Sequence, residues 1–236
     1  MEKKTDRRGR VILREIPFTG IRQVIGQRMR QSLDTAPQGS VFARFDMSAV
    51  VALRESCQSK GDKVSFTDIM IKAVAAAAKE CPGMNSALEN DVITVYETVN
   101  VGIAVQVDDI LVVPVINGAD EKSLLEIAAD TKVAIDNARN RRFDKLYMDG
   151  ATITVNNLGK FYIDGCTPVI NPPETAILGM GKIGKEAWVD ENDQIVARQV
   201  ATLSITINHA VVDGGQTGEF LGALKRILDS PADYIK

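Results

Sequence analysis

The chain has 236 residues, of which 45% are hydrophobic and 25% charged, and its formal net charge of −3 does not suggest a nucleic-acid binder. No segment approaches the roughly 18 unbroken apolar residues that a membrane helix needs, and the charged N-terminus is not a secretory signal. Three cysteines far apart in the sequence form neither a CxxC pair nor a disulfide framework, so a reducing cytoplasm is the expected location.

The N-terminal half predicts an arm followed by helices and one strand. Residues 1–15 are charged and aperiodic, which indicates a mobile charged arm or a linker remnant before one domain over 16–236. Apolar side chains then recur at helical spacing over 18–33, with Thr19 as a candidate N-cap. The next predicted elements are a strand over 40–47, a helix over 48–61 capped by Asp46 or Ser48, and an alanine-rich helix over 65–83 capped by Ser65 or Thr67.

The remainder of the chain is richer in strands. Residues 99–107 alternate strictly between apolar and other side chains, which predicts a strand with one buried face. The other predicted strands cover 111–116, 151–159, 175–181 and 199–208, and helices cover 121–142 and 214–230. This order predicts an α/β or α+β fold with a mixed sheet covered by helices.

A GxGxxG pattern is formed by Gly179, Gly181 and Gly184. A dinucleotide site requires a helix directly after these glycines, but the polar stretch 185–194 follows, so a turn between two strands is favoured. Lys182 lies beside the glycines without the GxxxxGK[ST] pattern of a phosphate-binding loop.

The only histidine, His209, follows the predicted strand over 199–208. The two-residue period of a strand places it on the same face as the apolar Ile205 and Ile207. Two interpretations follow: a packed, hydrogen-bonded structural histidine, or a neutral base beside a glycine turn. No second histidine or cysteine stands at ligand spacing, so a metal site is not expected.

Asp213 stands four residues after His209 and directly before two glycines. It could orient the imidazole ring, or it could hold the turn by pairing with an arginine elsewhere. The chain has no GxSxG sequence, so a serine-hydrolase triad has no support.

The segment NHAVVDGG resembles the HxxxDG signature of the dihydrolipoamide acyltransferase and chloramphenicol acetyltransferase superfamily. Further segments, among them IPFTGIRQVIGQRM, VSFTDIMIKAVAAAAKECPGMNSAL and NPPETAILGMG, resemble the acyltransferase catalytic domain of 2-oxo acid dehydrogenase complexes in order along 16–236. The resemblance implies a chloramphenicol-acetyltransferase-like two-layer α/β domain, trimeric, with active sites between neighbouring subunits.

The resemblance also implies a reaction, in which an acyl group moves between dihydrolipoamide and coenzyme A. His209 matches the general base that takes the proton of the attacking thiol. Asp213 matches a structural aspartate and Arg22 its partner. Coenzyme A would be a substrate, the lipoyl group would come from another domain or chain, and no metal would take part. The implied partners are a homotrimer or a larger cage of trimers, a lipoyl domain and dehydrogenase subunits, without nucleic acid or membrane.

Three departures from the family pattern keep alternatives open. Asn156 stands where a serine or threonine usually donates to the tetrahedral oxyanion, and its amide could also donate. Asn208 and Ala210 replace an aspartate and an arginine, and Ala210 is closer to the form of the antibiotic acetyltransferases. The lipoyl and subunit-binding domains are absent, so the chain is expected to be an excised core or a stand-alone protein. The alternatives are a stand-alone acetyl-CoA-dependent acetyltransferase of the chloramphenicol acetyltransferase type and a weakly active scaffold core. The sequence leaves the acyl group, the assembly beyond a trimer and the coenzyme A nucleotide contacts open.

Overall fold

The computed structural model describes residues 4–108 and 110–235. Its helices are α1 (Ile21–Thr35), α2 (Ser48–Ser59), α3 (Phe66–Glu80), η1 (Pro82–Met84), α4 (Leu124–Arg139), η2 (Phe143–Lys145), α5 (Gly214–Asp229) and α6 (Pro231–Tyr234). Its strands are β1 (Gln38–Asp46), β2 (Ser86–Glu89), β3 (Val92–Val95), β4 (Val101–Ile103), β5 (Val105–Val107), β6 (Ile110–Val112), β7 (Val115–Ile116), β8 (Ile153–Asn157), β9 (Ala176–Met180), β10 (Gly184–Val189) and β11 (Ile195–Asn208).

A mixed sheet forms the centre of the domain. Within the described residues it has seven strands in the order β1-β11-β9-β8-β4-β7, and β10 pairs with β11. β8 runs parallel to both β4 and β9, whereas the other pairs are antiparallel. β2 pairs with β3, and β5 with β6, as two separate hairpins. The expected mixed sheet is therefore confirmed.

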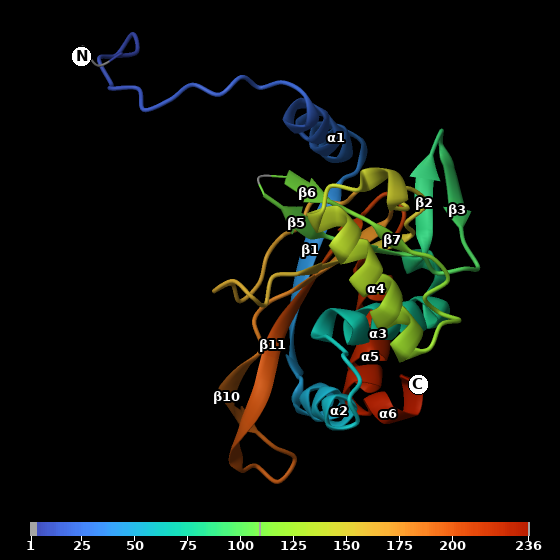
Figure 1. Ribbon diagram of the computed structural model, residues 1–236. Coiled ribbons are helices and arrows are strands. Elements are labelled where there is room, and N and C mark those ends of the chain that lie inside the picture. Colours follow the sequence, from blue (N-terminus) through green and yellow to red (C-terminus); the bar gives the residue numbers. More distant parts are fainter. Residues whose placement is uncertain (1–3, 109, 236) are drawn as a thin grey trace.

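Helices α2 and α5 lie against the long strands β11 and β1, and α3 packs against α5 and β8 (Figure 1). The side chains of Leu203, Ile205 and Ile207 on β11 are at most 3% exposed and belong to the hydrophobic core. Ser65 caps α3 as predicted, because its hydroxyl accepts from the amide of Asp68 and the Asp68 carboxylate accepts from the amide of Ser65. This two-layer arrangement fixes the end of β11, where the histidine follows.

Some local predictions are wrong. Gly20 takes the N-cap position of α1 with φ of 63° and no side-chain cap bond, so Thr19 does not cap the helix. Met47 takes that position in α2, although the Asp46 carboxylate accepts from the amide of Ser48. The strand predicted over 99–107 is interrupted at Ala104, because β4 pairs with β8 while β5 turns away to pair with β6.

The GxGxxG segment is a turn between two strands, as predicted, because β9 ends at Met180 and β10 begins at Gly184. The loop after β8 lies directly on this turn: a Cβ atom on Gly181 would stand 2.0 Å from the carbonyl oxygen of Asp164. Lys182 is 3.1 Å from the Asp164 carboxylate and lies over the ring of Tyr162. These contacts occupy the lysine within its own chain.

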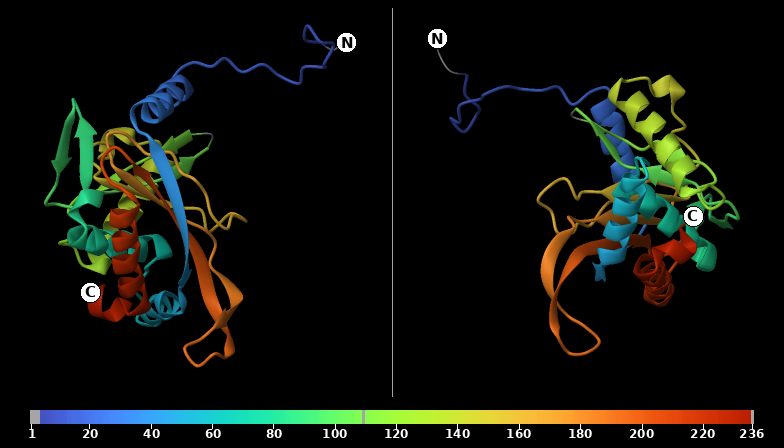
Figure 2. Two further views of the ribbon diagram at one scale, coloured as in Figure 1. Left: turned by 180° about the vertical axis from the view of Figure 1, so that it is seen from behind. Right: turned by 60° about the horizontal axis from the view of Figure 1, so that its bottom comes forward.

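The N-terminal segment 4–20 extends away from the rest of the chain in every view (Figures 1 and 2). It presents apolar side chains to solvent, including Leu13, which is 96% exposed. Among the described residues, no helix is both long enough and apolar enough to cross a membrane. The three cysteines are free thiols.

Candidate active site

The His209 turn, residues 208–213, directly follows β11. The amide of His209 donates to the Pro37 carbonyl at 2.8 Å, and the Asn208 side-chain oxygen accepts from the amide of Ala210 at 3.1 Å. The amides of Val211 and Val212 both donate to the carbonyl of Asn208. The backbone of the turn is therefore held tightly, while the His209 side chain itself is exposed. The interpretation of His209 as a packed structural histidine is wrong.

Strand alternation predicted that His209 lies on the apolar face of the strand, and there is a physical reason why its side chain is exposed instead. Strand alternation ends at Asn208, because His209 and Ala210 form a hydrogen-bonded turn and no longer follow the pleat. The Ile207 side chain lies in the core, whereas the His209 imidazole lies outside it. A Cβ atom on Gly39 would stand 3.4 Å from Cδ2 of His209, so the ring lies over the start of β1 and the glycine leaves room for it.

Asp213 holds the turn by capping α5. Its carboxylate accepts from the amides of Gly215 at 2.8 Å and Gln216 at 3.1 Å, and the Gln216 side chain accepts from the Asp213 amide in return. These bonds satisfy amides that have no partner inside the helix. Asp213 thus fixes where the turn ends and the helix begins, and its described hydrogen bonds do not reach the imidazole.

Arg22 lies in the first turn of α1, and its side chain is exposed. It is thirteen positions from Thr35 at the C-terminal end of α1, or roughly 20 Å of helix. That C-terminal end adjoins the His209 turn through Pro37. The pairing of Arg22 with Asp213 stays a prediction.

Asn156 lies near the end of β8, where it pairs with Gly179 of β9. Its side chain is half-buried, and none of the described residues forms a hydrogen bond with its amide group. The neighbouring Asn157 is different: it donates to the Thr67 hydroxyl at 2.9 Å and accepts from the amide of Gly159 at 2.8 Å. Of the two asparagines, Asn156 is therefore the one available to a ligand.

A cavity of about 440 Å³, here named the Asn156 cavity, lies between α1 and the sheet. Thr154, Asn156 and Ile177 line it from β8 and β9. Ile21, Val24, Ile25 and Met29 line it from α1. Twelve of its sixteen described lining residues are apolar. Such a cavity with a few placed polar groups is the usual form of a small-molecule site.

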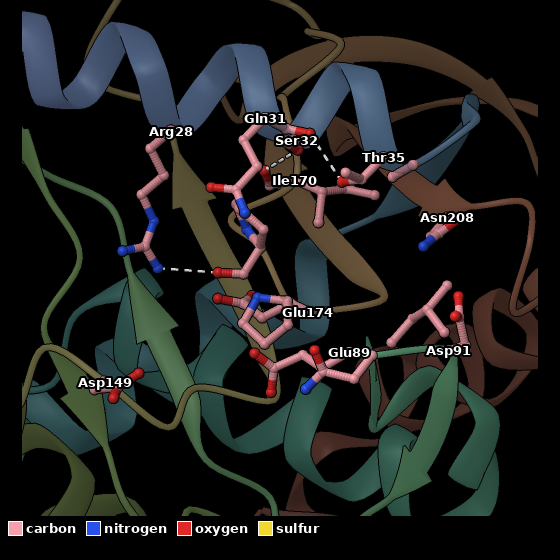
Figure 3. A pocket seen from close by; sticks show the side chains of 15 residues that line it. Arg28, Gln31, Ser32, Thr35, Glu89, Asp91, Asp149, Ile170, Glu174 and Asn208 are labelled. Carbon is pink, nitrogen blue, oxygen red and sulfur yellow. Dashed lines mark hydrogen bonds between the residues drawn. The ribbon is translucent and has the colours of Figure 1, made fainter.

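A second cavity of about 630 Å³, here named the Glu174 cavity, is more polar (Figure 3). Arg28 enters it from α1, and Asn208 enters from the end of β11 on the opposite side. Arg28 also lines the Asn156 cavity, and its guanidinium donates to Asn171 Oδ1 at 3.0 Å and to the Pro172 carbonyl at 2.9 Å. The Arg28 guanidinium with its acceptors Asn171 and Pro172, here named the Arg28 bridge, therefore lies between the two cavities.

Glu174 is 2% exposed and belongs to the segment that Arg28 holds. Its Oε1 accepts from Asn171 at 2.6 Å, whereas its Oε2 is buried without a hydrogen-bond partner among the described residues. Burial raises the pKa of Glu174 to about 7. Sequence reasoning missed Arg28 and Glu174, because one looks like part of an amphipathic helix and the other like a loop residue.

His209 and Asn156 do not meet within one chain. Asn156 pairs with Gly179, and Gly179 pairs with Ser204, which lies five residues before His209. Five residues correspond to roughly 16 Å along the strand, far beyond the reach of a single reacting group. Across the described residues, no cluster of three or more His, Cys, Asp or Glu side chains could hold a metal ion.

The fold is shared with chloramphenicol acetyltransferase. That structure superposes with a TM-score of 0.54 at 18% identity, over 86% of this chain and 94% of the other. The architecture is therefore that of the chloramphenicol-acetyltransferase-like class, as expected from the sequence.

A family model described as 2-oxoacid dehydrogenases acyltransferase (catalytic domain) matches residues 12–235. The chain belongs to this family, and the resemblance noted in the sequence is confirmed. A probable dihydrolipoamide acetyltransferase from Listeria monocytogenes superposes with a TM-score of 0.86 at 33% identity, over 92% of this chain and 94% of that one.

Two curated relatives cover the same region. A lipoamide acyltransferase component of a branched-chain alpha-keto acid dehydrogenase complex from Bacillus subtilis is 37% identical over 222 residues. A dihydrolipoyllysine-residue acetyltransferase component of a pyruvate dehydrogenase complex from Rickettsia bellii is 34% identical over 221 residues. Each alignment covers 92% of this chain, and the chain spans about half the length of these relatives, 52% and 53%.

The dihydrolipoamide acetyltransferase of Azotobacter vinelandii superposes with a TM-score of 0.86 at 29% identity, over 95% of this chain and 94% of that one. Its crystallographic and enzymatic study concerned the role of a serine, a histidine and an asparagine in the catalytic mechanism. That histidine and asparagine stand four positions apart, which is the spacing of His209 and Asp213.

Proposed function

We propose that this chain transfers an acyl group between dihydrolipoamide and coenzyme A. The observation that carries the proposal is the position of His209: its ring is exposed on a turn whose backbone is held by Pro37 and Asn208, in a chain of this family. The backbone that carries this imidazole is held in place, and the ring is open to a thiol that enters from solvent.

His209 acts as the general base. It takes the proton of the incoming thiol, and the thiolate attacks the thioester carbonyl carbon. The new carbon–sulfur bond forms as the carbonyl oxygen becomes an oxyanion, and Asn156 donates a hydrogen bond to that oxygen. The bond to the departing sulfur then breaks, and the imidazolium returns its proton to the departing thiolate. Asp213, paired with Arg22, maintains the architecture of the turn and moves no proton.

The active site forms between neighbouring subunits of a homotrimer. Support comes from the separation of Asn156 and His209 in one chain, which amounts to roughly 16 Å along β11 alone. A neighbouring protomer can place its own His209 beside this Asn156. The catalytic domain spans 16–236, after the arm over 1–15. Coenzyme A is a substrate, and a lipoyl domain, attached to this domain or on another chain, presents the lipoyl group. Dehydrogenase subunits are partners, and the location is the cytoplasm. A larger cage of trimers fits the name of a structural relative at 29% identity, the cubic core of a pyruvate dehydrogenase complex.

Mixing two inactive variants tests the function and the shared site together. His209→Ala and Asn156→Ala should each lose at least a hundredfold in acyl transfer when assembled alone. In randomly mixed trimers, roughly one interface in four receives both intact residues, so about a quarter of the wild-type activity should return. Two differently tagged His209→Ala chains form the matched control, which should stay inactive.

The measurement is transfer of acetyl groups from acetyl-CoA to free dihydrolipoamide. A mixture no more active than the separate variants would contradict a site shared between subunits. Unchanged turnover of Asn156→Ala alone would contradict the oxyanion role of this amide.

A further inference from the structure

The Asn156 cavity is lined mainly by apolar side chains, and β8 contributes its polar residues Thr154 and Asn156. Val24 of α1, Leu111 of β6 and Met148 before β8 line it and are 60%, 48% and 41% exposed. Large apolar side chains that are exposed around a cavity mark a surface that binds an apolar ligand or a neighbouring subunit, and a site formed between subunits requires both. The site is therefore an open, mainly apolar cavity with the Asn156 amide in its wall.

The polar groups of this cavity are few, and one is already engaged. Arg28 uses its guanidinium on Asn171 and the Pro172 carbonyl. No carboxylate is present among the described lining residues. The remaining Arg28 donors lie at the boundary with the Glu174 cavity, so a ligand carboxylate elsewhere in the Asn156 cavity would lie unpaired among apolar side chains, which is costly. The lining therefore favours a ligand group without charge.

The position of Asn156 indicates which part of the substrate occupies the cavity. This step rests on the proposed function, in which the Asn156 amide donates to the oxyanion. The oxyanion carbon must then lie at the cavity wall, so that its acyl substituent occupies the space that Val24 of α1 and Ile177 of β9 line. An acetyl group presents a single methyl group to the apolar wall, whereas a four- or five-carbon acyl group buries several carbons against it.

We infer that the Asn156 cavity is the acyl-binding pocket and that this protein prefers aliphatic acyl groups of four to five carbons, branched ones included, over acetyl and succinyl. Each additional buried methylene contributes a factor of about four in binding. Isovaleryl carries three more carbons than acetyl, so its kcat/KM should be about ten- to a hundredfold higher.

The test compares acetyl-CoA, isovaleryl-CoA and succinyl-CoA as donors to dihydrolipoamide, using the full chain. Two variants fill the cavity: Ala104→Leu, and Val24→Phe on the exposed side of α1 in case the first fails to fold. Either should lower the ratio of isovaleryl to acetyl kcat/KM at least tenfold. Ala129→Leu adds the same carbons on the exposed side of α4 and serves as the matched control, with an unchanged ratio.

The outcomes separate the acyl preference from the reaction. Preferred isovaleryl transfer that collapses in the filled variants supports the inference. A preference for acetyl or succinyl, or a ratio that the filled variants do not change, overturns it and leaves acyl transfer standing. Failure of all three donors with wild-type protein overturns the proposed function, and the acyl pocket with it.

Discussion

The His209 turn and the Asn156 cavity are built in different ways. The turn takes its shape from backbone and side-chain hydrogen bonds within 208–217 and from one bond to Pro37. The cavity takes its wall from α1, β6, β8, β9 and the loop before β9, and its contacts are mainly apolar. A self-contained turn can keep a reactive group constant, whereas a cavity assembled from many elements can change its contents through single substitutions.

This difference predicts that substitutions in the two regions will change different measured properties. Removing the imidazole should change the chemistry and leave the fold intact, because the ring is exposed. Changes around the cavity should alter acyl preference or the free energy of unfolding, because its residues join several elements. Three substitutions sharpen the comparison, from the largest expected effect to the smallest: two lie in the His209 turn, and the third is at Glu174, which accepts from Asn171 in the wall of the cavity.

His209→Ala should lower kcat for acyl transfer by about a thousandfold, because general bases contribute factors of 10²–10⁴. The melting temperature should stay close to that of the wild type, since no core contact is lost. Turnover with acetyl-CoA and dihydrolipoamide, measured beside thermal unfolding, checks both. His209→Gln, which keeps a polar side chain but no base, should be equally slow. A residual rate within tenfold of wild type would remove His209 from the reaction.

Glu174→Gln should remove a pH-dependent loss of stability. The folded-state pKa of about 7 lies above the ordinary value of 4.5, so the unfolded chain loses its proton first as pH rises. This group therefore destabilises the fold progressively between about pH 4.5 and 7, by about 3 kcal/mol in all. The glutamine still accepts from Asn171 but does not ionise.

Urea unfolding at pH 5 and pH 8 measures this effect. The change in unfolding free energy between the two pH values should differ by about 2–3 kcal/mol between wild type and variant, with the wild type losing more. Any constant cost of the glutamine cancels in this difference. Parallel pH profiles for the two proteins would show that Glu174 titrates normally.

Asp213→Ala should lower the unfolding free energy by about 1 kcal/mol, the usual value of an N-cap. Asp213→Asn keeps an oxygen that accepts from the amides of Gly215 and Gln216 and removes only the charge, so its cost measures the proposed pair with Arg22 apart from the cap. Chemical denaturation of both variants distinguishes capping from charge. If the asparagine costs as much as the alanine, the charge of Asp213 matters, as a pair with Arg22 would require.

The sequence allowed much of the turn to be predicted and little of the cavity. His209, Asp213 and the glycines lie within a few residues of one another, and the family signature spans them. Even there, the two-residue period of the strand suggested that the His209 ring packs in the interior, because periodicity cannot show at which residue the strand ends. The cavity joins residues more than 140 positions apart, such as Arg28 and Asn171, so no local pattern marks it. The mixed sheet and the capping of α3 followed from alternation and spacing.

The hydrogen bond from His209 to Pro37 gives the two regions a mechanical connection. Pro37 lies two residues beyond α1, the helix that lines the Asn156 cavity with its apolar side chains. An acyl chain that displaces α1 when it enters also pulls on the backbone that carries the imidazole. Because that imidazole serves the next interface of the proposed trimer, the fit of an acyl group in one site would set the alignment of the base in the neighbouring site, and the three sites would not turn over independently.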